Sequence, residues 1–163
     1  MPGKVIGKIM NYGFPGTVSR SGDAVIEVYA AGAEIRFGQP VVLDDDGKVI
    51  PFGAANTAAD FIGVACRTVK QAADDTGEAW YQEGDAVDVL VRGSASVACA
   101  TGTPAMKGAV NVYTVAVEGS AEVGDFAGAE VESKTVALTN VIWSTGKLDA
   151  YRNAEITILS RNI

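Results

Sequence analysis

DFIGVACRTVKQ (residues 60–71) and YQEGDAVDVLVRGSASVAC (residues 81–99) carry the best strand signals of the chain, and a long acidic connection joins them. Side chains alternate along a strand, so the run 87–91 places three valines on one face. Arg92-Gly93 interrupts that run, and alternation resumes over 94–99 with Ala95, Val97 and Cys99 on one face. Nothing in this stretch has the chemistry of a catalyst.

Two glycines, Gly63 and Gly93, interrupt otherwise good strands in this stretch. Glycine inside a strand usually marks a bulge or a close backbone approach. Further short strands separated by turns are predicted over 24–30, 110–117, 136–143 and 154–159. No segment has a clean helical period, so the expected fold class is all-β: an antiparallel β-barrel or sandwich-like body with an extended N-terminal arm and long loops.

The N-terminal segment differs in charge from the rest of the chain. Residues 1–22 contain three basic side chains and no acid, whereas the other residues carry ten basic and twenty acidic side chains. Glycines keep this segment flexible, and Pro15 favours an extended conformation at the residue before it. We therefore expect an arm over residues 1–22 and a single β domain over 23–163, although a first edge strand on the chain's own sheet explains the same residues.

Composition excludes several classes of function. The net charge of −7 argues against nucleic-acid binding, and no apolar run is long enough to span a membrane. The N-terminus lacks the apolar region of a signal peptide, so synthesis in a cytoplasm is expected. With no histidine, no phosphate-binding loop and no nucleophile elbow, neither an enzyme nor a cofactor is predicted.

No metal site is predicted either. The acids Asp44, Asp45 and Asp46 are consecutive, whereas calcium loops place acids at alternate positions, so a solvated hairpin turn explains them. Cys66 and Cys99 lie within apolar strand patterns and are interpreted as two buried thiols, with a disulfide as the alternative.

The residues resemble a known family. FIGVACRTVKQ and YQEGDAVDVLVRGSASV are similar to two phrases of the structural cement (head decoration) proteins of tailed bacteriophages. Phe14-Pro15-Gly16 with Arg20, the segment 37–42, Trp143–Lys147 and the final strand also resemble that family. Cys66 and Cys99 are not positions associated with it.

The resemblance implies a non-catalytic capsid protein. It would bind the outer surface of the icosahedral head and clamp neighbouring subunits of the phage major capsid protein against internal DNA pressure. It would be made in the host bacterial cytoplasm, end in the virion, and associate with itself as a dimer or a trimer.

Two sets of contact residues follow as hypotheses. The arm would contact the capsid or a sister subunit through Lys4, Ile6, Lys8, Met10, Tyr12, Phe14, Pro15 and Arg20. Trp80 and Tyr81 would form a secondary contact, or would begin a strand that packs on the core. Two other functions compete: a small-molecule or carbohydrate-binding β-barrel with Trp80, Tyr81 and Trp143 at its site, and a peptidase of the prohead-protease type, which the missing histidine disfavours.

Overall fold

The computed structural model describes residues 11–68 and 80–161, and all of the regular structure in these ranges is β. The all-β prediction is therefore confirmed. The described part of the chain has no helix long and apolar enough to cross a membrane. The strands are β1 (Val18–Ala30), β2 (Pro40–Leu43), β3 (Val49–Pro51), β4 (Phe61–Ala65), β5 (Ala86–Thr101), β6 (Ala109–Tyr113), β7 (Phe126–Ala127), β8 (Thr135–Trp143) and β9 (Asn153–Ile158).

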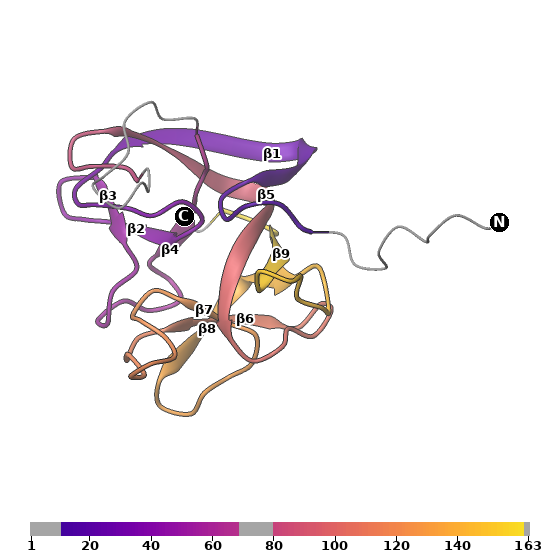
Figure 1. The fold of residues 1–163 in the computed structure, drawn as a ribbon. Helices are drawn as coiled ribbons and strands as arrows, with labels where there is room; N and C mark the ends of the chain where they lie inside the picture. The colour runs from indigo at the N-terminus through magenta and orange to yellow at the C-terminus, as the bar shows by residue number, and fades with distance from the viewer. Residues whose placement is uncertain (1–10, 69–79, 162–163) are drawn as a thin grey trace.

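The long strand β5 is shared by two halves of the molecule (Figure 1). Its C-terminal part pairs with β7 and β9, and the order β5-β7-β6-β8-β9 returns to β5, which closes a five-stranded barrel. Its N-terminal part belongs to an open sheet with the order β3-β2-β4-β5-β1. The β5–β7 pairing is parallel and all other strand pairings are antiparallel, so the antiparallel prediction fails at this one contact.

The two halves have separate apolar cores. The barrel encloses a larger cluster that includes Trp143, Phe126 and Ile156. The open sheet covers a smaller cluster built around Ile35, Tyr81 and the three valines of the 87–91 run. Burial of apolar side chains from strands far apart in sequence is the main stabilising term for each half.

β5 reaches both cores because Gly93 changes which side chains point inward. The sequence suggests a break at Arg92-Gly93, but the structure shows one continuous strand of 16 residues. Before Gly93 the odd-numbered valines face the smaller core; after it Ala95, Val97 and Cys99 face the larger one. Gly93 has φ 116°, and a Cβ there would lie 2.9 Å from Cα of Ala24. The prediction that this glycine marks a close backbone approach is confirmed.

β1 starts earlier than the sequence suggests. The sequence predicts a strand over residues 24–30, yet the strand begins at Val18. The register against β5 jumps from Arg20–Ser94 to Val25–Arg92, so the intervening residues form a wide bulge rather than a turn. Residues 18–22, assigned to the arm, therefore lie within the sheet. The residues that bulge are those that pass over Gly93.

The three consecutive aspartates form the predicted hairpin turn between β2 and β3. Oδ1 of Asp44 accepts backbone N–H bonds from Asp46 at 3.0 Å and from Lys48 at 2.8 Å. Gly47 adopts φ 74° at the tip of the turn. The carboxylate of Asp44 thus caps its own turn, which accounts for it without a cation.

Candidate interaction site

Residues 12–17, near the start of the described part of the chain, are fixed to the body by hydrogen bonds on both sides. Gly16 donates its N–H to the carbonyl of Ser96 at 2.8 Å, and Ser96 donates back to Thr17 at 2.9 Å. Residue Arg67 donates its backbone N–H to the carbonyl of Gly16 at 2.8 Å. We call residues 12–17 the arm root, because residues 1–10, outside the described ranges, precede them.

A second pair of contacts holds the outer end of the arm root at the barrel. The backbone N–H of Tyr12 donates to Oδ2 of Asp149 at 3.1 Å, and Nδ2 of Asn153 donates to the carbonyl of Gly13 at 3.1 Å. Burial raises the pKa of Asp149, but hydrogen bonds from Asn153, Tyr12 and Tyr151 outweigh this effect and leave it below its ordinary value of 3.8. The ionised carboxylate is therefore the form that holds the arm root.

Two glycines allow the arm root to lie against the loop before β2. Gly16 has φ 82° and Gly38 has φ 78°, a region that other residues rarely adopt. A Cβ on Gly38 would lie 2.6 Å from the backbone N of Gly16, and one on Gly16 would lie 2.8 Å from the carbonyl O of Ala65. The two backbones are in contact, with no space between them for a side chain.

Side chains from four segments that are distant in sequence meet beside these glycines. The guanidinium of Arg67 lies 4.9 Å from the ring centroid of Phe14 and 5.2 Å from that of Phe37. The Phe37 ring in turn meets Tyr81 edge to face at 5.3 Å. These residues belong to four of the phrases that carried the family resemblance.

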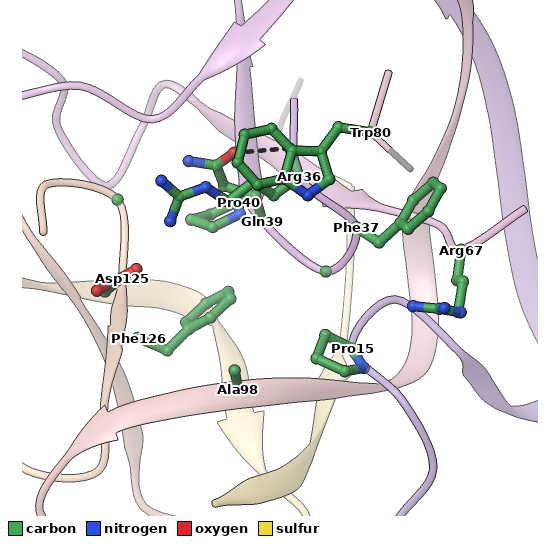
Figure 2. Close-up of a pocket in the computed structure, with 12 residues that line it drawn as sticks. Pro15, Arg36, Phe37, Gln39, Pro40, Arg67, Trp80, Ala98, Asp125 and Phe126 are labelled. Carbon is green, nitrogen blue, oxygen red and sulfur yellow. Dashed lines mark hydrogen bonds between the residues drawn. The ribbon is translucent and has the colours of Figure 1, made fainter. Parts of the chain in front are cut away.

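An open groove of about 450 Å³ lies next to this cluster, between the two halves of the molecule. Figure 2 shows Ala98 of β5 at its floor, Phe37 and Arg67 on one side, and Asp125 and Phe126 on the other. Arg36 lies at its upper rim, 5.0 Å from the Trp80 ring, and its Nη2 is 2.9 Å from Oε2 of Glu122. Apolar and polar side chains share the lining of the groove, with Arg36, Gln39, Arg67 and Asp125 as its polar members.

The structure places the predicted arm residues in different situations. Lys4, Ile6, Lys8 and Met10 lie outside the described residues. The half-buried Tyr12 and Pro15 belong to the arm root, whereas Phe14 is 66% exposed. Arg20 lies on β1, with Nη2 2.9 Å from Oε1 of Glu155, so its guanidinium is paired within the chain.

The structure places the two predicted aromatic contact residues in different environments. Trp80 is half-buried at the groove, whereas Tyr81 is buried and donates its hydroxyl to the carbonyl of Cys66 at 2.9 Å. Backbone hydrogen bonds between Ile35 and Tyr81, 2.9 Å in each direction, fix it there. For Tyr81 the alternative of packing on the core describes the structure. Trp143 is fully buried in the other core, so Trp80, Tyr81 and Trp143 do not line a common ligand site.

The two cysteines do not offer a reactive thiolate, and the described residues do not form a metal cluster. Cys66 and Cys99 are both free and buried. Burial raises the pKa of the Cys66 thiol to about 11, and burial likewise raises that of Cys99, so both stay protonated near neutral pH. Among residues 11–68 and 80–161, no group of three or more Cys, Asp or Glu side chains is arranged to hold a metal ion.

The sequence analysis did not identify three members of the candidate site. They are Arg67, Phe37 and Asp149, whose carboxylate accepts the bond from Tyr12. Arg67 and Phe37 were noted only as letters in family phrases, and nothing in the sequence indicates that they meet. Asp149 gave no signal, because the bond to Tyr12 joins residues 137 positions apart. The sequence feature that could have indicated this contact is the pair of glycines, Gly16 after Pro15 and Gly38 after Phe37.

Comparison with known proteins gives a consistent result. The family model described as "Structural cement protein (E217 gp24/Pam3 gp6)" matches residues 2–160. A chain from "The capsid of Myoviridae Phage XM1" has a similar fold, with a TM-score of 0.69 and 16% sequence identity over 94% of each chain. A search of curated proteins returned no match.

Proposed function

The chain belongs to the structural cement protein family, and from this premise we propose that it binds the outer surface of an icosahedral phage head and clamps neighbouring major capsid protein subunits. The family match over residues 2–160 carries the proposal, because it includes both the arm and the body. The role is mechanical and needs no catalysis. Many copies on one head add up, so each needs only a modest interface.

The arm root attaches the arm to the body, and the residues before it would contact the capsid. Residues 12–17 are bonded to the body at both ends, so the capsid would be reached by residues 1–10 with Lys4, Ile6, Lys8 and Met10. The exposed ring of Phe14, stacked on Arg67, would extend that contact at the surface of the body. Ordering a free segment costs conformational entropy, and a root that is already fixed reduces this cost on binding.

The test is a truncation placed by the structure. A variant lacking residues 1–10 keeps the arm root, β1 and the Arg20–Glu155 pair, whereas a cut at residue 20 would also remove part of the sheet. Binding to heads of the encoding phage is measured by co-sedimentation, with head stability followed by heating. We expect the truncated protein to remain folded by circular dichroism and to bind heads at least tenfold more weakly, which corresponds to about 1.4 kcal/mol.

Two outcomes would contradict parts of the proposal. Unchanged affinity of the truncated protein would remove the arm from the contact. No binding of the full chain to heads, either as purified or after expansion, would remove the clamping role itself. A matched control is Lys107→Ala, an exposed lysine on the turn before β6, which should bind heads like the full chain.

A further inference from the structure

Arg67 differs from the other arginines of the chain in what its guanidinium contacts. Salt bridges within the chain engage Arg20, Arg36, Arg92 and Arg161. The guanidinium of Arg152 donates instead to two backbone carbonyls. The exposed side chain of Arg67 has no carboxylate or carbonyl acceptor among residues 11–68 and 80–161. Its N–H groups can therefore bond to an acceptor on another molecule.

Aromatic rings hold this guanidinium in position. Its central carbon lies 4.9 Å from the ring centroid of Phe14 and 5.2 Å from that of Phe37. The Phe37 ring is fixed in turn by its edge-to-face contact with Tyr81. Stacking on aromatic rings leaves the N–H groups at the edge of a guanidinium available to an acceptor. The side chain is thus ordered before a partner arrives, which reduces the entropy lost on binding.

Arg36, the other arginine that lines the groove, shows the same kind of stacking together with a carboxylate. It lies 5.0 Å from the Trp80 ring, and its Nη2 is 2.9 Å from Oε2 of Glu122. At Arg67 the stacking occurs without a carboxylate from the described residues. A carboxylate is the group that matches the edge of a guanidinium best, since it can accept two parallel N–H bonds.

The groove beside Arg67 has room for the protein segment that would carry such a carboxylate. Its volume of about 450 Å³ is within the range of binding pockets. Figure 2 shows Arg67 at one end of the groove, Asp125 at the opposite end and Ala98 at the floor between them. Oδ2 of Asp125 accepts the backbone N–H of Glu122 at 2.8 Å, so this carboxylate belongs to its own turn. A partner acid is attracted to the Arg67 end and repelled from the Asp125 end, which fixes its direction in the groove.

We propose that Arg67 binds a carboxylate side chain of a major capsid protein subunit, and that the capsid segment carrying it lies over Ala98 in the groove. This inference rests on the proposed function and adds the chemistry of one contact to it. The carboxylate would accept paired N–H bonds from the guanidinium, while its apolar neighbours pack against Pro15 and Phe37. A chain of net charge −7 repels acidic surfaces in general, so an acid gains attraction only where it meets Arg67 or another basic group.

Binding of Arg67 variants to heads of the encoding phage, measured by co-sedimentation, tests the basic side of this contact. Arg67→Met keeps an apolar stem but removes the charge and the donors, and should weaken binding by about thirtyfold, a typical loss for an arginine at the centre of an interface. Arg67→Glu should weaken binding further, because it repels the capsid carboxylate. Lys107→Glu causes the same change in net charge at an exposed turn and should bind like the natural chain.

Modified heads test the acidic side of the contact. Carbodiimide and glycinamide convert the exposed carboxylates of the heads to neutral amides before the protein is added. The natural chain and Arg67→Met should then bind these heads equally, because the partner of Arg67 has lost its charge. Circular dichroism checks that each variant is folded. Arg67→Lys, which keeps the charge but not the paired donors, should bind untreated heads with an affinity between those of the natural chain and Arg67→Met.

The possible outcomes separate this inference from the proposed function. If Arg67→Met and Arg67→Glu bound untreated heads like the natural chain, Arg67 would have no part in the contact and the clamping role would stand. A difference between the natural chain and Arg67→Met that persisted on amidated heads would show that the partner group is not a carboxylate. If the natural chain did not bind untreated heads at all, the clamping role and this inference would both be overturned.

Discussion

The closed barrel and the open sheet share β5 but differ at their edges. A strand at the edge of a sheet exposes unpaired backbone N–H and C=O groups, and only the open sheet has such strands. The barrel pairs β5 with β9 from Gly93 to Ala98 and leaves none of its own strands at an edge. The open sheet ends at β1 and forms one wall of the groove, whereas the arm root is bonded to both halves of the molecule. From this difference we propose that the barrel supplies most of the stability and that the open sheet, with the arm root, would supply the contacts to the capsid.

The largest effect on the free energy of unfolding is expected for a substitution in the core of the barrel. Trp143 is fully buried and meets Phe126 at 6.4 Å between ring centroids. Trp143→Ala should lower the free energy of unfolding by about 4 kcal/mol, because it removes a large apolar side chain and leaves a cavity. Urea denaturation measures this. A loss below about 1 kcal/mol would mean that the barrel core does not dominate stability.

A smaller effect is expected at Gly38, which contacts the arm root, and Gly47 in the β2–β3 turn has a similar φ and serves as its matched control. Gly38→Ala forces a side chain into a left-handed residue and against Gly16, and we expect a loss of about 3 kcal/mol from strain and overpacking. Gly47→Ala, at φ 74° with open space around it, should cost only about 1 kcal/mol. Equal losses in the two variants would show that the close approach of the arm root contributes nothing to stability.

Much of this division could be predicted from the sequence, since local patterns dictate strands and turns. The run 87–91, the Asp-Gly turn at 46–47 and the bulge glycine Gly93 each act through nearest neighbours, and each appears as predicted. The parallel pairing of β5 with β7 could not be predicted, because β7 is only two residues long and has no pattern of its own.

The candidate site was less predictable than the fold, for a related reason. The stacking of Arg67 on Phe14 and Phe37 joins residues from three separate segments, and its only trace in the sequence is the pair of glycines that permits it. The start of β1 was missed because Ser21-Gly22-Asp23 has the composition of a turn, whereas pairing of the flanking residues Arg20 and Val25 with β5 keeps the strand continuous across this bulge. Tertiary pairing overrides local preference at such positions.

The smallest effect concerns the bond that ties the two regions together, between Asp149 beside the barrel and Tyr12 of the arm root. The pKa of Asp149 lies below 3.8, so its carboxylate contributes fully to stability above pH 3.8, and this contribution is lost as pH falls through the folded-state pKa. Asp149→Asn removes the charge and one acceptor oxygen. The variant should therefore be less stable than the natural chain at neutral pH, and the difference should shrink as the pH falls below 3.8. Urea midpoints against pH measure the difference, with Asp45→Asn, a turn residue remote from the arm root, correcting for net charge. If the difference stayed constant down to acid pH, a neutral side chain would hold Tyr12 as well as the carboxylate does, and the charge at Asp149 would have no part in joining the arm root to the barrel.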